Sequence, residues 1–238
     1  MENGQTYVPV SFDPCGSVFV MFREKAQDEG HKVELKPLAE PKPLMELSGP
    51  WEVSFDSKWF YPDNGMGAKV EFKQLEDWSK RPEEAVKFFS GTAVYEKEFE
   101  APANPASGRM DLDLGQVEVI AEVELNGKNL GVLWKPPFRV DVTEALKPGQ
   151  KNKLVVKVVN LWPNRLIGDE HLPADCQYAE KGNLVAWPQW LVENKARTSG
   201  RRTFTTWRHW KANDPLQPSG LLGPVRLVPA TVTTITGK

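Results

Sequence analysis

The segment Val117-Glu118-Val119-Ile120-Ala121-Glu122-Val123-Glu124-Leu125 carries the clearest secondary-structure signal in the chain. Val117, Val119, Ala121, Val123 and Leu125 occupy every second position, and three glutamates lie between them. Because successive side chains of a strand point to opposite faces, this alternation predicts a half-buried antiparallel strand. Asn126-Gly127 follows at once. Both residues tolerate a positive φ, which predicts a two-residue hairpin turn.

Weaker signals of the same kind lie on both sides of this segment. Short runs rich in β-branched and aromatic residues predict strands over 51–55, 92–99, 138–142, 154–159 and 224–228. Helix signals are confined to Pro82–Val86, with Ser79 as its cap, and to one turn at Thr143–Leu146. About seven short strands over roughly 190 residues predict an all-β fold, an antiparallel β-sandwich of the jelly-roll type.

The N-terminal part is expected to be separate from this sandwich. Alternation at Val8, Val10 and Phe12 and the run 17–22 predict two strands, which cannot form a stable unit alone. A polar stretch and a proline-rich linker follow. We therefore expect the terminal strands of a preceding β-domain plus linker over 1–43, the sandwich over 44–232, and a tail over 233–238.

Charge and composition exclude several classes of function. The chain has 30 Lys+Arg and 32 Asp+Glu among 238 residues, a net charge of −2, so no global field attracts nucleic acid or a membrane. No apolar run reaches the length of a membrane span. The two cysteines, Cys15 and Cys176, are too few for a disulfide framework, and whether they pair is left open.

Several motifs in a fixed order resemble a known family. They are Gly91–Phe99, Asp113–Gly115, Ala121–Gly131, Pro137–Thr143, Asn152–Val156 and Ser219–Val225. Over roughly 45–230 the chain resembles the sugar-binding β-sandwich of glycoside hydrolases of the β-galactosidase and β-glucuronidase type. Within that group, Asn160–Asp169 looks most like the C-terminal module of α-L-rhamnosidase-like enzymes.

The resemblance implies a galactose-binding-domain-like jelly roll in a larger hydrolase. In such enzymes the catalytic carboxylates lie on a separate (β/α)8 barrel, and no strand–helix alternation of that length occurs here. No catalytic residue is therefore expected. The implied partners are a glycan or plant-type polysaccharide and the catalytic barrel domain of the same polypeptide, without nucleic acid or membrane. The N-terminus has no signal peptide, so a periplasmic or secreted location is expected only as part of a longer protein.

Tryptophans are the main candidates for ligand contact. Six of the nine lie between residues 134 and 210, largely in a stretch with poor strand patterning. An indole ring can stack on the apolar face of a pyranose. The expected ligand-binding residues are Trp162, Asn164, Arg165, Trp187, Trp190, Arg202, Trp207 and Trp210. Alternatively, these rings fill the ends of the sandwich or face a neighbouring domain.

Charged residues of the same stretch allow further hypotheses. Asp169, Glu170, Glu180 and Glu193 could supply a glycosidase pair, although solvated or ion-paired carboxylates, such as an Arg165–Asp169 contact, are the more common case. The basic residues suit an acidic polysaccharide or, less well, single-stranded nucleic acid; alternatively they form a solvated loop or pair with a neighbouring domain. They are Lys195, Arg197, Arg201, Arg202, Arg208 and Lys211.

No cofactor or metal is expected. A zinc site around His171, with Asp175 and Cys176 nearby, lacks ligand-motif spacing. A structural Ca²⁺ at Asp56, Asp63 and Asn64 is an alternative to ordinary turn residues. Three functions therefore compete: a non-catalytic module of a glycoside hydrolase, a free-standing carbohydrate-binding module, and a small glycosidase with a loop carboxylate pair.

Overall fold

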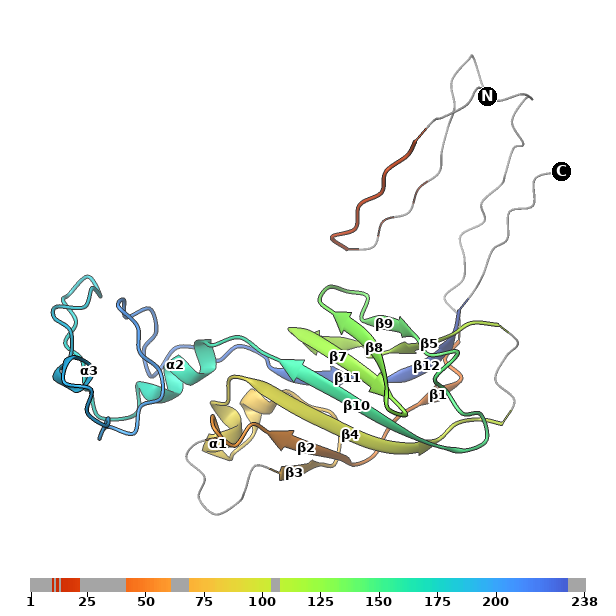
Figure 1. Cartoon of the computed structure of the whole chain (residues 1–238), viewed down its shortest axis with the longest axis horizontal. Coiled ribbons are helices and arrows are strands. Elements are labelled where there is room, and N and C mark those ends of the chain that lie inside the picture. Colours follow the sequence, from red (N-terminus) through yellow and green to blue (C-terminus); the bar gives the residue numbers. More distant parts are fainter. Residues whose placement is uncertain are drawn as a thin grey trace.

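The chain folds as an antiparallel β-sandwich from which one long segment projects (Figure 1). The computed structural model describes residues 10, 12, 14–21, 42–60, 69–103 and 108–230. Its strands are β1 (Met45–Glu46), β2 (Trp51–Phe55), β3 (Lys69–Phe72), β4 (Thr92–Glu100), β5 (Met110–Asp113), β6 (Gln116–Glu118), β7 (Ile120–Leu125), β8 (Lys128–Leu133), β9 (Arg139–Asp141), β10 (Lys151–Val159), β11 (Gly220–Gly223) and β12 (Arg226–Pro229). Its helices are η1 (Trp78–Lys80, 3-10), α1 (Glu84–Lys87), α2 (Pro163–Asp169) and α3 (Gln189–Val192).

The strands form two main layers. One sheet has the order β3-β2-β4-β10-β7-β8, and the other has the order β1-β12-β5-β9. A small sheet of β6 and β11 completes the core. Neighbouring strands in all three sheets are antiparallel, which confirms the predicted sandwich.

The centre of the larger sheet is the long pair β4–β10. Its register runs from Lys151 opposite Glu100 to Val159 opposite Thr92. Alternate residues of β10 are buried, as the period of two requires. This strand also ends directly before the projecting segment, so its rigid pairing fixes where that segment leaves the sandwich.

The segment that dominated the sequence signal is divided between two sheets. The alternation predicts one continuous strand over 117–125, but the structure has β6 paired with β11 and β7 paired with β10. Of the five side chains predicted to face inward, Val117, Ala121, Val123 and Leu125 are buried, and Val119 is half-buried. Burial periodicity was therefore predicted correctly, whereas the change of pairing partner at Val119 leaves no mark in the pattern.

The predicted hairpin turn is confirmed. Asn126 and Gly127 have φ values of 53° and 82° and connect β7 to β8. Asn126 adds a second function, because its amide nitrogen donates to Ala145 O at 2.8 Å and its amide oxygen accepts from Lys153 N at 2.9 Å. The turn is thus tied to the neighbouring loop and to β10.

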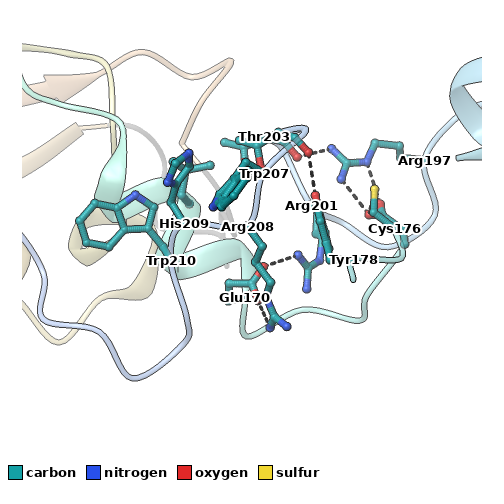
Figure 2. A pocket seen from close by; sticks show the side chains of 13 residues that line it. Glu170, Cys176, Tyr178, Arg197, Arg201, Thr203, Trp207, Arg208, His209 and Trp210 are labelled. Atoms are coloured by element: carbon teal, nitrogen blue, oxygen red, sulfur yellow. Dashed lines mark hydrogen bonds and ion pairs between the residues drawn. The ribbon is translucent and has the colours of Figure 1, made fainter. Parts of the chain in front are cut away.

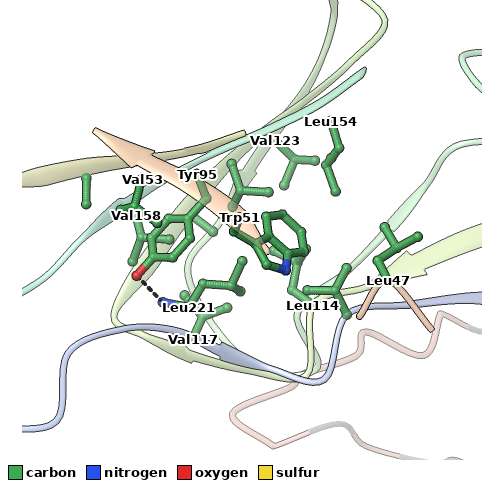
Figure 3. Close-up of a cluster of buried hydrophobic side chains, with 14 of the residues drawn as sticks. Leu47, Trp51, Val53, Tyr95, Leu114, Val117, Val123, Leu154, Val158 and Leu221 are labelled. Atoms are coloured by element: carbon green, nitrogen blue, oxygen red, sulfur yellow. Dashed lines mark hydrogen bonds between the residues drawn. The ribbon is translucent and has the colours of Figure 1, made fainter. Parts of the chain in front are cut away.

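Large aromatic and aliphatic side chains fill the space between the layers. Trp51 and Tyr95 meet edge to face with ring centroids 6.5 Å apart. The Tyr95 hydroxyl accepts a hydrogen bond from Leu221 N at 3.2 Å, which links the larger sheet to β11 (Figure 3). Burial raises the pKa of Tyr95, so this phenol stays protonated.

A second aromatic group lies at the end of the core beside α1. Phe89 packs edge to face on Phe55 with centroids 4.8 Å apart, and its centroid is 5.9 Å from that of Trp78. All three side chains are buried. Phe89 belongs to the loop 88–91 between α1 and β4, which is bonded to Asn160 directly before the projecting segment.

Two expectations about local structure are wrong. Ser79 lies inside η1, and Asp77 caps that helix by accepting from Ser79 N at 3.0 Å; α1 starts later, after Glu83. The strand expected at 17–22 is absent from residues 17–21, which are exposed and irregular, while Phe22 lies outside the described residues. Thr143–Leu146 forms a hydrogen-bonded turn, as predicted. Of the strand expected near Val8, only Val10 and Phe12 are described, so that prediction and the domain boundaries stay predictions.

Candidate functional site

The segment 161–218, here called the arm, connects β10 to β11 and extends well beyond the end of the sandwich (Figure 1). It contains α2, α3 and otherwise only turns and single β-bridges, such as Tyr178 with Leu184 and Asn183 with Trp207. Five of the nine tryptophans lie in it. Because long irregular segments of this kind commonly carry function, the arm is the candidate functional site.

The two ends of the arm are closed by a buried polar joint. Asn164 is fully buried, and its amide nitrogen donates to Gln217 O at 2.8 Å, while its amide oxygen accepts from Gln217 N at 2.8 Å. The same amide nitrogen reaches Ser219 Oγ at 3.1 Å, and Asn160 donates to that oxygen at 2.9 Å. The Ser219 N–H donates to Asp77 on the sandwich at 3.0 Å. Both ends of the arm are thus bound to each other and to the core.

Helix α2 carries a buried ion pair that organises the next part of the arm. Arg165 Nη2 lies 3.0 Å from Asp169 Oδ1, one helical turn away, and both side chains are about 2% exposed. The other oxygen of Asp169 accepts from Arg202 N at 2.8 Å and from Thr203 N and Oγ1, both at 2.7 Å. The Asp169 carboxylate therefore holds a loop more than thirty residues away in sequence.

Glu170, the neighbour of Asp169, is the hub of a second set of contacts. It accepts from Arg201 Nη1 at 2.8 Å and from Arg208 Nε at 2.9 Å (Figure 2). Arg201 also donates to the backbone oxygens of Pro173 and Leu172. The hollow that these side chains enclose together with Trp207 and Trp210 measures only ≈ 30 Å³. This volume is about what one water molecule needs. The side chains inside the arm therefore hold its shape and do not form a ligand pocket.

The far part of the arm is held by a third ion pair. Asp175 accepts from Arg197 Nε at 2.8 Å and Nη2 at 3.0 Å, and from Ser199 Oγ at 2.5 Å. Burial acts to raise the pKa of Asp175, but the hydrogen bonds from Arg197 and Ser199 outweigh it and hold the pKa below its ordinary value. Burial and the Asp175 charge raise the pKa of the adjacent Cys176 thiol, which disfavours the reactive thiolate.

The lowered pKa of Asp175 predicts an acid-sensitive arm. A carboxylate with a lowered pKa in the folded state stabilises that state above its ordinary pKa of about 3.9, and this contribution is lost as the pH falls through the lowered value. We expect the thermal midpoint of Asp175→Asn, followed by near-ultraviolet circular dichroism, to lie below that of the unmodified protein at pH 7. The two midpoints should converge below about pH 4. A difference that is equal at pH 7 and pH 3 would contradict this assignment.

The predicted ligand-binding residues fall into separate groups. Trp187 and Trp190 come together on Phe204, with ring centroids 6.0 and 5.7 Å from it. Trp207 and Trp210 line the small hollow beside Glu170. Trp162 packs against Trp59 of the sandwich at 5.3 Å. The structure thus brings four of the five expected tryptophans together in two pairs, whereas Trp162 lies with Trp59 apart from them.

Three polar residues were also predicted to bind ligand, and the structure shows different partners for them. Asn164 and Arg165 are buried in the joint and in α2, so neither side chain is presented to a ligand at the surface. Arg202 is exposed, and its backbone N–H is bound by Asp169. Whether any of the candidates touches sugar stays a prediction.

At least four of the six cations of the basic stretch form ion pairs within the arm. Arg197 is paired with Asp175, and both Arg201 and Arg208 are paired with Glu170. Lys195 is paired with Glu193. These cations are therefore already engaged, which weakens the hypotheses of an acidic polysaccharide or nucleic acid bound by a free cationic surface.

The remaining hypotheses concern carboxylates and metals. The Arg165–Asp169 contact is confirmed, Glu170 and Glu193 are ion-paired, and Glu180 is exposed. Among the residues that the structure describes, no group of three or more His, Cys, Asp or Glu side chains is placed to hold a metal ion. Of the calcium candidates, Asp63 and Asn64 lie outside those residues.

Both cysteines are unpaired, and none of the described helices is long and apolar enough to cross a membrane.

The family model of the glycosyl hydrolase 2 galactose-binding domain-like group matches residues 73–221, which is more than half of the chain and includes the whole arm. The chain belongs to this family. The family and the fold that were predicted from the sequence of this galactose-binding-like chain are therefore both confirmed. The arm is a part of the family pattern and lies within the matched range.

Relatives of the family support the same assignment. A protein of Formosa agariphila, named provisionally as a β-glucuronidase, is 50% identical over 190 residues, which cover 79% of this chain and 16% of that protein. A rhamnosidase structure from Novosphingobium sp. PP1Y has a TM-score of 0.62 and 33% identity, over 84% of this chain and 16% of the other. A Ruminococcus gnavus β-glucuronidase structure is 26% identical over 53% of this chain and 22% of the other, with a TM-score of 0.42.

The galactose-binding-like chain spans about one sixth of the length of these first two relatives. In them the corresponding region is a domain of a larger protein. Sequence reasoning identified the family but missed the residues that build the arm, above all Thr203 and Ser219. Their partners, Asp169 and Asn164, lie 34 and 55 residues away in sequence, so no local pattern indicates the contacts.

Proposed function

We propose that this chain is a non-catalytic domain of a glycoside hydrolase that supports the catalytic domain of the same polypeptide through its arm. The observation that carries the proposal is the arm itself: a rigidly anchored projection with exposed aromatic and aliphatic side chains at its surface. Leu161, Trp162, Val185, Val192 and Trp207 are all exposed. Five large apolar side chains exposed along one projecting segment support contact with a neighbouring domain.

The carboxylates of the arm support a non-catalytic role. A general acid must reach the glycosidic oxygen of its substrate. Asp169 is 1% exposed, and its oxygens are held by Arg165, by two backbone N–H groups and by Thr203. Glu170 is held by two arginines. Neither carboxylate is placed to protonate a leaving group, which argues against the small-glycosidase hypothesis.

A chimera with the Formosa agariphila relative tests the supporting role. Residues 44–230 replace the 50% identical segment of that protein. In a second chimera, residues 171–207 of the arm are replaced by a short Gly-Ser linker, since Glu170 and Arg208 are in contact and their ends can be rejoined. We expect the first chimera to keep the hydrolytic activity of its host towards aryl glycosides. The second should lose at least tenfold of it, because the contact surface is missing.

The isolated chain is the control for catalysis. We expect it to fold and to hydrolyse no aryl glycoside. Equal activity of both chimeras, or hydrolysis by the isolated chain that disappears in Asp169→Asn or Glu180→Gln, would overturn the proposal.

A further inference from the structure

A groove on the outer part of the arm has the features of a sugar subsite. It lies between the segments 174–177 and 186–190, and its open space is about 660 Å³. This is within the range of small-molecule sites. The groove is separate from the small hollow around Glu170, although both include Asp175 and Cys176.

Hydrogen bonds hold the two walls of the groove together. Val185 N donates to Gln177 O at 2.9 Å near one end. The indole nitrogen of Trp190 donates to Asp175 O at 3.3 Å near the other. The spacing of the walls is thus fixed before any ligand arrives, which lowers the entropic cost of binding.

Trp187 supplies an aromatic platform in this groove. Its side chain is 59% exposed, and its ring leans on Phe204. Phe204 in turn packs edge to face on Trp190, and the guanidinium of Arg197 lies 4.5 Å from the centroid of the Trp190 ring. This row of packed groups supports the Trp187 ring, and much of that ring stays exposed to solvent.

The polar groups around the platform are amides. Gln177 and Gln189 are exposed and line the groove, and each side chain offers both donors and an acceptor. The only charged side chain among the described residues of its lining is Asp175, whose oxygens are turned to Arg197 and Ser199. No cation in this lining compensates the carboxylate of a uronic acid.

We propose that the Trp187 groove binds an uncharged pyranose, which stacks one face on the Trp187 indole and hydrogen-bonds to Gln177 and Gln189. The apolar C–H face of such a ring matches the platform, and its hydroxyls match the amides. A uronate would find no cation among the described residues that line the groove, and the Arg197 guanidinium behind Trp190 is already paired with Asp175. This inference rests on the proposed function, because it gives the supporting arm a role in holding glycan near the enzyme.

Matched methyl glycosides test the ligand class. The probes are methyl β-D-glucopyranoside with methyl β-D-glucuronide, methyl β-D-galactopyranoside with methyl β-D-galacturonide, and methyl α-L-rhamnopyranoside. Binding to the whole chain is followed by the NMR signals of the indole N–H groups, which also report millimolar affinities. We expect at least one uncharged glycoside to move the Trp187 signal saturably, and its charged counterpart to bind roughly tenfold more weakly.

Two tryptophan variants test the location. Trp187→Ala should weaken binding roughly tenfold or more. Trp134→Ala is the matched control, because Trp134 is 67% exposed but lies after β8 on the sandwich, and this variant should bind normally. Gln189→Ala should weaken binding several-fold without touching the aromatic row, which keeps the test valid if Trp187→Ala disturbs Phe204.

Three outcomes would overturn the proposal: no saturable shift with any uncharged glycoside, tighter binding of a uronide than of its uncharged counterpart, or equal losses in the Trp187 and Trp134 variants. None of them affects the chimera result. Failure of this subsite and failure of the supporting role are therefore distinguishable.

Discussion

Replacing Asp169 by alanine is expected to destabilise the arm by about 3–5 kcal/mol, the usual cost of removing one partner of a buried ion pair. Arg165 would remain in the interior with its charge uncompensated. The N–H groups of Arg202 and Thr203 and the Thr203 hydroxyl would lose their acceptor at the same time. Urea denaturation followed by tryptophan fluorescence measures the loss.

Hydrogen exchange identifies where the loss occurs. We expect the amides of Arg202 and Thr203 in Asp169→Ala to exchange much faster, while those of β4 and β10 change little, because the arm can open without unfolding the sandwich. Glu144→Ala is the control: Glu144 pairs with Lys128 at 2.6 Å, but both side chains are at least half exposed. Such pairs contribute about 0–1 kcal/mol. Similar effects of the two substitutions would contradict the organising role of Asp169.

Truncation of Phe89 to alanine is the second large effect. Its ring is fully buried against Phe55 and Trp78, and its backbone belongs to the loop that anchors the arm. Buried Phe→Ala changes cost about 3–5 kcal/mol, because transfer free energy is lost and a cavity remains. We expect a loss of that size in the free energy of unfolding of the sandwich. The m-value, which is the dependence of this free energy on urea concentration, should stay unchanged.

The position of Phe89 gives this variant a second readout. Its backbone oxygen accepts from Asn160 Nδ2 at 3.0 Å, so a shifted loop also loosens the joint of the arm. Phe19→Ala is the comparison, since Phe19 is 91% exposed and should change stability by less than about 0.5 kcal/mol. A Phe89 variant that resembles it would mean that this end of the core is not tightly packed.

The sequence predicted the sandwich because burial on one face leaves a period of two in the strands, as at the inward positions Ala121, Val123 and Leu125. It did not predict the division between β6 and β7, because the inward positions continue unchanged while the partner strand changes. Pairing partners are a property of the whole fold, and a local pattern contains no information on them.

The arm could be predicted only as an irregular segment rich in tryptophan. Helix α2 has seven residues, among them Pro163 and Gly168, so it shows no apolar periodicity. The rest of the arm is fixed by ion pairs and side-chain-to-backbone contacts over long sequence separations, such as Arg197 with Asp175. A basic stretch in sequence therefore looked like a free cationic surface, although its charges are mostly used inside the arm.

The joint of Asn164, Gln217 and Ser219 has an evolutionary consequence. Because both ends of the projecting segment are clasped beside the core, its outer portion can be lengthened, shortened or rewritten while the sheets beneath keep their register. A family built on this plan can diversify what it touches at a single place and inherit everything else. Homologues should accordingly vary most in length between α2 and β11, and least at the clasp.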